Sequence, residues 1–365
     1  MWTPYPTPDV KSLASLRSRA LYIVGAGAQT PLGRYVLAAA AAARCGMSAY
    51  AEHPFMIDKD GEPMIVGRAR WLDDSFSLEQ RVGMLATDAV MECLRPIIKE
   101  LPALRRQLRT HFALSAESFP QLPQRQRFLD GFAAGAALNS SGPIEVVAEG
   151  HAGGLLALSN ACRELQSGEA QFCLVGGADS YMDPMRLQDI DLAGRLHSIK
   201  QRWGFTPGEG AAFCLITTGD SARRLHLMPL AEVLAVATAQ EAKLMGTEAV
   251  CLGDGLTAAF RGVLDPKHRV SHCYCDLNGE TYRADEYGFA ICRTSDYFDD
   301  AARFTAAAES WGDVGAASGS LALTLALAAW ARGYARGPVN LVWASSAHAP
   351  LRGAALLRQW DATAR

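Results

Sequence analysis

The sequence predicts a mixed α/β protein built on a largely parallel sheet. The main observation is that apolar, strand-like runs alternate with helix-like runs along the chain. The second is composition: the 365 residues are 49% hydrophobic and 20% charged, which supports a large core and excludes intrinsic disorder. The length fits two domains or one large α/β unit.

The first half of the chain carries the clearest local signals. Short apolar runs predict strands at residues 21–24, 112–115, 144–147, 172–175 and 211–217. Helices are expected directly after residues 30–33 and at residues 77–98 and 151–166. Residues 119–130 are polar and contain two prolines, so we expect a surface loop or cap there.

The second half repeats this order of elements. Strands are expected at residues 230–239, 270–277 and 339–343, helices at 254–264 and 315–332, and a polar loop after residue 277. The halves show no direct residue similarity, so an internal duplication is a topological hypothesis. We divide the chain into an N-terminal arm (1–20), an N-terminal half (21–222) and a C-terminal half (223–365).

Composition and simple motifs exclude several classes of function. A net charge of −3 and the lack of a long Lys/Arg block argue against nucleic-acid binding. We expect no secretory signal and no membrane span. The nine cysteines are scattered and indicate reduced thiols in a cytoplasmic protein. No metal is expected, because Cys273-x-Cys275 lacks a second ligand pair, and no cofactor, because Gly25-x-Gly27 lacks the full dinucleotide spacing.

Several segments, taken in order, resemble those of β-ketoacyl synthases and their thiolase-superfamily relatives. The most specific is Gly204-Phe205-Thr206-Pro207-Gly208-Glu209-Gly210-Ala211, which is similar to the family segment G-F-x-x-G-E-G-A. Residues 21–33, 148–155, 175–180 and 312–319 resemble the opening strand, the nucleophile elbow, the following strand end and the third catalytic segment. The resemblance covers roughly residues 21–360.

This resemblance implies a thiolase fold of five layers, α-β-α-β-α, with two similar βαβ-rich halves around two central helices. The Ala- and Gly-rich runs after His151 and Gly315 fit such enclosed helices. It also implies a dimer, formed with a second copy or with a related synthase or other protein, in which edge strands pair. Acyl-CoA and acyl carrier protein are the small-molecule and protein ligands it suggests.

At the catalytic positions of that family the chain carries different residues. His151 stands where the family has its acyl-accepting cysteine, and imidazole cannot form a stable thioester. Asn278 and Asp313 stand where the family has histidines. Simpler roles are open for each: a vestigial histidine, a turn former beside Gly279, and an N-terminal cap of the following helix.

A fourth requirement is also altered. Residues 345–352 replace the family's glycine-rich gate, which puts the second donor of an oxyanion hole in doubt. The leading hypothesis is therefore a degenerate pseudoenzyme that acts as a structural partner or adaptor. The alternative is an acyltransferase or hydrolase of acyl-CoA or acyl-carrier thioesters in which His151 and Asp313 form a base dyad. We also expect Glu209 to hydrogen-bond backbone and stabilise the fold.

Overall fold

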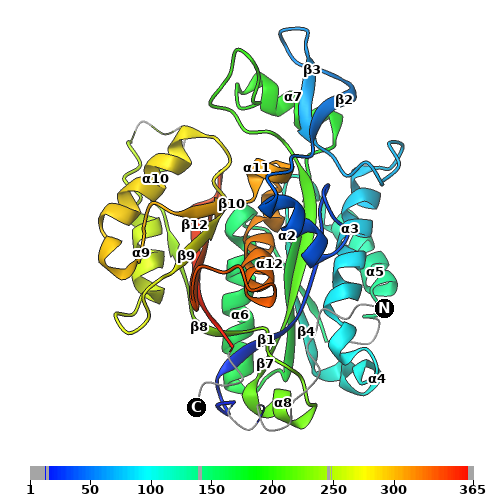
Figure 1. The fold of residues 1–365 in the computed structure, drawn as a ribbon. Coiled ribbons are helices and arrows are strands. Elements are labelled where there is room, and N and C mark those ends of the chain that lie inside the picture. The colour runs from blue at the N-terminus through cyan, green and yellow to red at the C-terminus, as the bar shows by residue number, and fades with distance from the viewer. Residues whose placement is uncertain (1–12, 14–15, 139–141, 245–246, 248, 361–365) are drawn as a thin grey trace.

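The computed structural model describes residue 13 and residues 16–138, 142–244, 247 and 249–360. The strands of the first half are β1 (Leu21–Gln29), β4 (Leu108–Leu114), β5 (Ile144–Val147), β6 (Phe172–Ser180) and β7 (Glu209–Thr218). Those of the second half are β8 (Ala231–Gln240), β9 (His272–Cys275), β10 (Phe304–Ala306), β11 (Val339–Ser345) and β12 (Leu351–Gln359). All ten form one sheet (Figure 1).

The sheet consists of two five-stranded halves with the same plan. Their strand orders are β1-β7-β6-β4-β5 and β8-β12-β11-β9-β10. In each half the first two pairings are antiparallel and the last two are parallel. The halves are joined where residues 21–23 of β1 pair with residues 231–233 of β8. This repeat of order and direction confirms the two similar halves.

Helices complete the five layers. The middle layer holds α6 (Gly153–Ser167), which packs on β4, β6, β8 and β12, and α12 (Ser318–Ala331), which packs on β6, β7, β9 and β11. The outer layer of the first half contains α3 (Leu78–Cys93) and α5 (Leu122–Gly135), and that of the second contains α9 (Asp254–Val263) and α10 (Thr281–Cys292). Figure 1 shows α6 and α12 between the two halves of the sheet.

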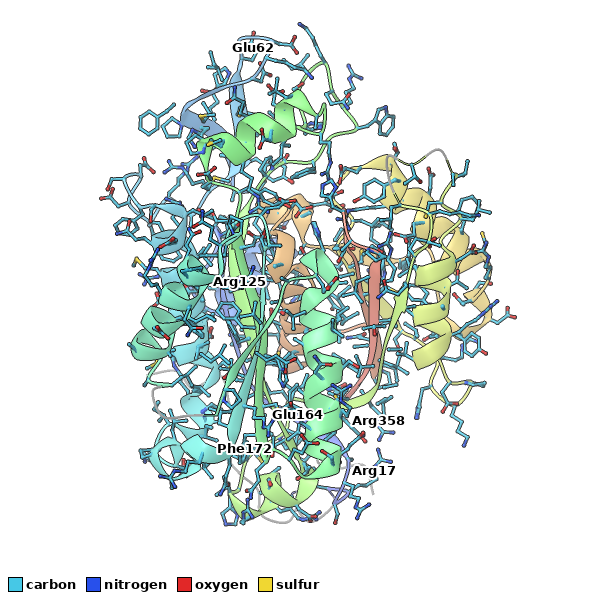
Figure 2. All side chains as sticks on the ribbon, turned by 180° about the vertical axis from the view of Figure 1, so that it is seen from behind. Arg17, Glu62, Arg125, Glu164, Phe172 and Arg358 are labelled. Atoms are coloured by element: carbon cyan, nitrogen blue, oxygen red, sulfur yellow. The ribbon has the colours of Figure 1, made fainter. Side chains whose placement is uncertain are left out.

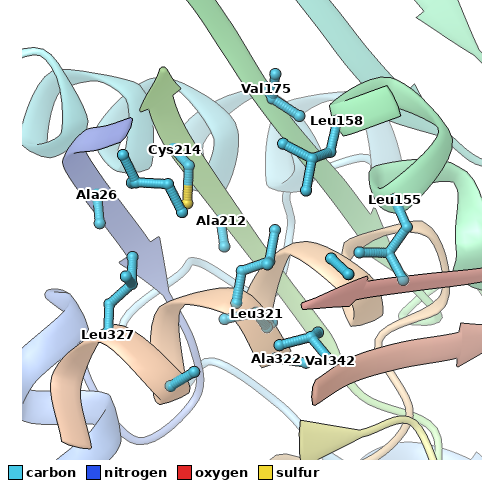
Figure 3. Close-up of a cluster of buried hydrophobic side chains, with 14 of the residues drawn as sticks. Ala26, Leu155, Leu158, Val175, Ala212, Cys214, Leu321, Ala322, Leu327 and Val342 are labelled. Carbon is cyan, nitrogen blue, oxygen red and sulfur yellow. The ribbon is translucent and has the colours of Figure 1, made fainter. Parts of the chain in front are cut away.

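The core follows the same layers. One apolar cluster fills the space between the halves, and two others lie under the outer helices. In the central cluster, Leu155 and Leu158 of α6 lie near Leu321 of α12 and near Val175 and Val342 of the two half-sheets (Figure 3). Every residue from 318 to 330 is buried, as expected for a helix that is apolar all round.

Shorter elements connect these layers. The helices are α2 (Val36–Arg44), α4 (Leu101–Leu104), α7 (Pro184–Leu192), α8 (Gly219–Arg224) and α11 (Ala308–Trp311). The 3-10 turns are η1 (Arg95–Ile97), η2 (Arg105–Gln107), η3 (Gly150–Ala152), η4 (Ser295–Tyr297) and η5 (Gly315–Ala317). A hairpin of β2 (Tyr50–Ile57) and β3 (Pro63–Gly67) projects beside α7 and forms a cap over one end of the molecule (Figure 1).

Several local predictions were wrong. The sheet is mixed rather than largely parallel, because β7 and β12 run antiparallel to both of their neighbours. The expected loop at 119–130 contains most of α5, whose Phe128, Leu129 and Phe132 are buried on one face. The expected polar loop after residue 277 is largely α10. The β2–β3 hairpin, α7 and β12 were not predicted.

Two predictions fall partly or wholly outside what the structure can address. Most of the predicted N-terminal arm, residues 1–20, lies outside the described residues; of its described members, Leu13 and Leu16 are buried in the core of the first half and residues 17–19 are exposed. The boundary between residues 222 and 223 stays a prediction. Among the described residues, no helix is long and apolar enough to cross a membrane.

Candidate active site

The candidate site lies where the starts of the two central helices meet. The chain turns through Gly150, whose φ is +67°, into η3 and then α6. A Cβ at Gly150 would lie 3.3 Å from Ser346 Oγ, so both the backbone angle and the space favour glycine. His151 follows directly and is buried, with 5% of its surface exposed.

The structure places His151 and Asp313 in direct contact. His151 Nε2 is 2.9 Å from Asp313 Oδ1 and 3.0 Å from Oδ2. Asp313 Oδ1 also accepts a hydrogen bond from the Gly315 N–H at 2.8 Å, at the start of the second central helix. The Asp313 carboxylate therefore binds the His151 imidazole and also accepts from a backbone N–H at the start of a helix. The pairing with His151 and the helix cap, which the sequence left as alternatives, occur together.

Asn278 joins the same carboxylate. Its Nδ2 donates to Asp313 Oδ2 at 2.6 Å and to Glu280 Oε2 at 3.0 Å, while its Oδ1 accepts from the Glu280 N–H at 3.1 Å. Gly279 between them has a φ of +105°. Asn278 thus bridges two carboxylates and also lies in the tight turn in which Gly279 adopts its positive φ.

Arg195 and Glu280 were missed by the sequence reasoning. Arg195 Nε and Nη2 donate to Glu280 Oε1 and Oε2 at 2.7 and 3.0 Å, a bidentate pair. The same guanidinium contacts the His348 imidazole. These residues are 85 positions apart and belong to no local motif, so only the fold reveals the pair.

A second ion pair lies behind the first. Arg283 Nη1 donates to Asp276 Oδ2 at 2.7 Å and to the Ser345 carbonyl at 2.6 Å, and both side chains are almost completely buried. The site therefore contains three pairs, Asp276 with Arg283, Glu280 with Arg195 and Asp313 with His151, and the His348 imidazole beside Arg195.

These partners lower the pKa of two of the carboxylates, Asp313 and Glu280. Burial acts to raise the pKa of Asp313, but His151, Arg283 and the Gly315 N–H outweigh it and hold that pKa well below its ordinary value. Burial also acts to raise the pKa of Glu280, but the paired Arg195 lowers it, and the pKa of Glu280 lies below its ordinary value. Burial and the nearby Arg195 lower the pKa of His348.

A serine hydroxyl occupies the region of the expected gate. Ser346, at the end of β11, accepts a hydrogen bond from the Ala152 N–H at 3.1 Å and donates to the Glu149 carbonyl. Arg352 Nη1 donates to the Ser346 and Ala349 carbonyls, each at 3.1 Å, and fixes the turn into β12. The elbow and the gate segment are thus bonded together, and the Ala152 N–H is engaged.

The segment resembling G-F-x-x-G-E-G-A holds Asp313 from the other side. The Asp313 N–H donates to the Thr206 carbonyl at 2.8 Å, and the Gly208 N–H donates to the Asp313 carbonyl at 2.7 Å. The Gly67 N–H, at the end of β3, donates to the Pro207 carbonyl at 2.7 Å. The backbone of this segment therefore lies between the cap hairpin and Asp313.

Glu209 anchors that segment. Its Oε1 accepts from the Ala69 N–H at 2.7 Å and from Arg81 Nη2 at 2.6 Å, and its Oε2 accepts from Arg81 Nε and Ser180 Oγ, each at 2.9 Å. Glu209 is fully buried. The expected backbone hydrogen bond is confirmed, and the Arg81 partner is an addition.

A pocket reaches one side of the site. It has a volume of about 490 Å³ and is lined by Asn278, Glu280, Tyr50 and Trp203 among others. A much smaller hollow, of about 10 Å³, borders Asp313 on its other side. His151 lines neither of these two spaces. The Glu280 and Asn278 side chains are therefore more accessible from the larger pocket than the His151 imidazole is.

Comparison with known proteins agrees with this architecture. Residues 116–222 match the model of the domain family described as β-ketoacyl synthase, N-terminal domain. Over this segment the chain is similar to β-ketoacyl synthases. No curated protein matches the sequence significantly. The structural similarities below extend beyond the matched segment to both halves.

Three solved structures illustrate the similarity. The ketosynthase assembly AntDE with its acyl carrier protein AntF has a TM-score of 0.77 and 14% identity, covering 94% of this chain and 100% of the other. The ishigamide ketosynthase/chain length factor has a TM-score of 0.70 and 22% identity, covering 93% and 99%. The ketosynthase ApeO in complex with its chain length factor ApeC, from Xenorhabdus doucetiae, has a TM-score of 0.75 and 16% identity, covering 93% and 98%. At these identities the comparison establishes the thiolase fold.

Proposed function

We propose that this ketosynthase-like protein does not condense acyl groups and acts as a structural partner or adaptor of another protein. The observation that carries the proposal is the closed network around Asp313. Its carboxylate is bonded to His151, Asn278 and the Gly315 N–H at once. Each charged group of the site already has a partner inside the protein, so little remains to bind or activate a thioester.

The chemistry of the acyl-accepting position supports the same conclusion. A Claisen condensation on this fold needs a thiolate to store the acyl group, and an acyl-imidazole formed on His151 would hydrolyse readily. The reaction also needs two hydrogen-bond donors beside the thioester, at the positions held here by Asn278 and Asp313. Asn278 can donate a hydrogen bond but cannot shuttle protons, and the Asp313 carboxylate is held as an acceptor.

The partner that the fold suggests is a related synthase or an acyl carrier protein. The similar structures include ketosynthases in complex with a chain length factor or an acyl carrier protein. The free edge strand β5 leaves one side of the sheet available for pairing with another chain. A dimer, with a second copy or with a different protein, would use that edge or a surface beside it.

A second candidate function rests on one contact. The 2.9 Å distance between His151 Nε2 and Asp313 Oδ1 is that of an oriented base, and the carboxylate would stabilise an imidazolium. In this case the protein would hydrolyse or transfer acyl groups from acyl-CoA or acyl carrier protein. Asn278 would then help to orient Asp313.

One experiment separates the two functions. The purified full chain is incubated with octanoyl-CoA, and released CoA is measured by thiol assay while covalent adducts are sought by intact-mass spectrometry. We expect no turnover and no adduct. Turnover that disappears in His151→Ala and persists in His268→Ala, a histidine away from the site, would establish the enzyme and remove the inert-partner proposal.

Co-expression tests the partner directly. The chain is produced with the products of its flanking genes and analysed by size-exclusion chromatography with light scattering. A stoichiometric complex, or a homodimer when no flanking protein binds, is the expected result. A monomer under all these conditions would contradict the partner role.

Restoring the thiol adds a sharper check. His151→Cys should label with iodoacetamide at residue 151, in addition to the exposed Cys45 and Cys292, yet still fail to decarboxylate malonyl-CoA, because Asn278, Asp313 and Ser346 are unchanged. Decarboxylation by this single variant, compared with His151→Ser as its control, would show that the site has lost only its nucleophile.

A further inference from the structure

A group of potential metal ligands lies away from the candidate active site. His111 of β4, Glu164 of α6 and Cys173 of β6 converge, although they are separated by 53 and 9 positions in the sequence. Glu164 and the first residue of β6, Phe172, are labelled near the lower end of α6 in Figure 2. No metal was predicted from the sequence, because Cys273-x-Cys275 lacks a second ligand pair; His111, Glu164 and Cys173 share no local spacing motif.

The donor atoms are close enough to share one ion. His111 Nε2 is 3.0 Å from Glu164 Oε2, and Cys173 Sγ is 3.9 Å from the same oxygen. One donor atom of each residue lies within 4.8 Å of the others. Zinc bonds of about 2.0–2.3 Å to nitrogen, oxygen and sulfur place ligand atoms at such separations.

Charged side chains lie beside two of the three ligands. Glu145 Oε2 lies 3.1 Å from His111 Nδ1, although without hydrogen-bond alignment, and Arg109 Nη1 lies 3.4 Å from Glu164 Oε1. The outward atoms of His111 and Glu164 thus face groups of opposite character, and Nε2 and Oε2 are left facing each other, while the Cys173 thiol lies 3.8 Å from the Ala161 carbonyl oxygen. Carboxylate–histidine pairs of this kind commonly support metal ligands from outside.

The histidine lies between two carboxylates. A neutral imidazole has a single N–H, so one of the two carboxylates would face a nitrogen lone pair. A metal ion on Nε2 removes this conflict, because the proton then resides on Nδ1, 3.1 Å from Glu145 Oε2, and the lone pair of Nε2 binds the ion. His111 and Cys173 are almost completely buried and the Glu164 side chain is 11% exposed, so an unsatisfied arrangement is costly.

We propose that His111, Glu164 and Cys173 bind a zinc ion. One imidazole, one carboxylate and one thiolate form a mixed nitrogen, oxygen and sulfur set that suits zinc and disfavours magnesium or calcium. Binding removes the Cys173 Sγ proton to solvent and leaves a fourth position for water. The ion ties β4, β6 and the end of α6 together and is independent of the partner role proposed above.

Metal titration of the full chain tests the site. After removal of metal with a chelator, Zn²⁺ should bind with a stoichiometry of one ion per chain and raise the thermal midpoint, whereas Mg²⁺ should do neither. Co²⁺, used as a spectroscopic probe, should give a thiolate-to-cobalt charge-transfer band. Both signals should be lost in Cys173→Ser and strongly weakened in His111→Gln.

Cys162→Ser is the matched control, because Cys162, a residue of α6, is also buried but is absent from the cluster. It should keep the cobalt band. Circular dichroism checks that each variant is folded. If the folded wild-type chain takes up no zinc, or if the cobalt band survives in Cys173→Ser, the cluster is an imidazolium held between two carboxylates and the proposal is wrong.

Discussion

Glu209 shows how one buried charge can organise several segments. Its two oxygens accept four hydrogen bonds, from Ala69, from two nitrogens of Arg81 and from Ser180. The three partner residues come from the stretch after β3, from α3 and from the end of β6. Because both Glu209 and Arg81 are buried, removing one partner leaves the other charge without compensation.

Glu209→Ala should lower the free energy of unfolding by about 3–5 kcal/mol, the cost of breaking a buried ion pair. The measurement is chemical denaturation followed by circular dichroism. The exposed Glu52→Ala is the control and should change stability by less than about 0.5 kcal/mol. An unchanged midpoint in Glu209→Ala would contradict the structural role.

Glu92 predicts a pH dependence of stability. Burial raises its pKa to about 7, although the Ala28 and Val36 N–H groups, which donate to it at 2.9 and 3.2 Å, act against that rise. The folded protein therefore binds a proton that the unfolded chain has already released between about pH 4.5 and pH 7. This contribution to stability is present below that window and is lost as the pH rises through it.

Glu92→Gln resembles the protonated side chain and should flatten this dependence. The stability difference between variant and wild type should shift in favour of the variant by up to roughly 3 kcal/mol from pH 4.5 to pH 7.5. Urea denaturation at several pH values measures it. Parallel pH profiles for the two proteins would show that Glu92 does not titrate in this range.

At the scale of single residues, the sequence located part of the site. His151, Asn278 and Asp313 were found because each sits in a recognisable segment, and the structure brings all three together. Arg195 and Glu280 were missed because their pairing depends on two loops that meet only in the fold. The same reason hid the His111 cluster.

At the scale of elements, glycines mark where backbones approach closely. A Cβ on Gly177 of β6 would lie 2.3 Å from the Ala316 carbonyl oxygen at the start of the second central helix. By contrast, a Cβ on Gly131 in α5 would meet no atom within 4 Å. The same substitution should therefore have opposite effects at these two positions.

Gly177→Ala should destabilise the protein by about 1–3 kcal/mol through overpacking, and Gly131→Ala should stabilise it by about 0.5–1 kcal/mol through helix propensity. Denaturation midpoints of the two variants, measured in parallel with wild type, test this contrast. Equal shifts would indicate that β6 and the helix start are less closely packed than the structure has them.

Element type was predictable where the apolar pattern was strong. The buried strand β6 and the central helix α12 agree with the prediction because most of their residues are apolar. The helix α5 was missed because Pro123 and several polar residues suggested a loop, while the proline lies in the first turn, where helices tolerate it. The cap hairpin was missed because its outward residues are polar and apolar without clear alternation.

At the scale of the whole molecule, the two halves share one interior. The helix α6 belongs to the first half yet packs on β8 and β12, and α12 belongs to the second half yet packs on β6 and β7. The fold class was predictable from the order of segments. This interlocking was implied by the family resemblance, and local patterns alone could not have specified it.

Separating the halves should therefore prevent folding. A fragment of residues 21–222 loses α12 and exposes the apolar faces of α6 and β7, so it should lack a cooperative thermal transition. The full chain, measured by the same calorimetry, should show one. A fragment with a sharp transition and dispersed amide resonances would show that the first half is an independent domain.

The cap hairpin is mechanically connected to the candidate site. The Gly67 N–H is bonded to the Pro207 carbonyl, and the neighbouring Thr206 and Gly208 hold the Asp313 backbone on both sides. A force applied to the hairpin would be transmitted through these few hydrogen bonds to Asp313, the residue that positions His151. A protein that binds the cap hairpin and displaces it would therefore also displace the buried Asp313 carboxylate.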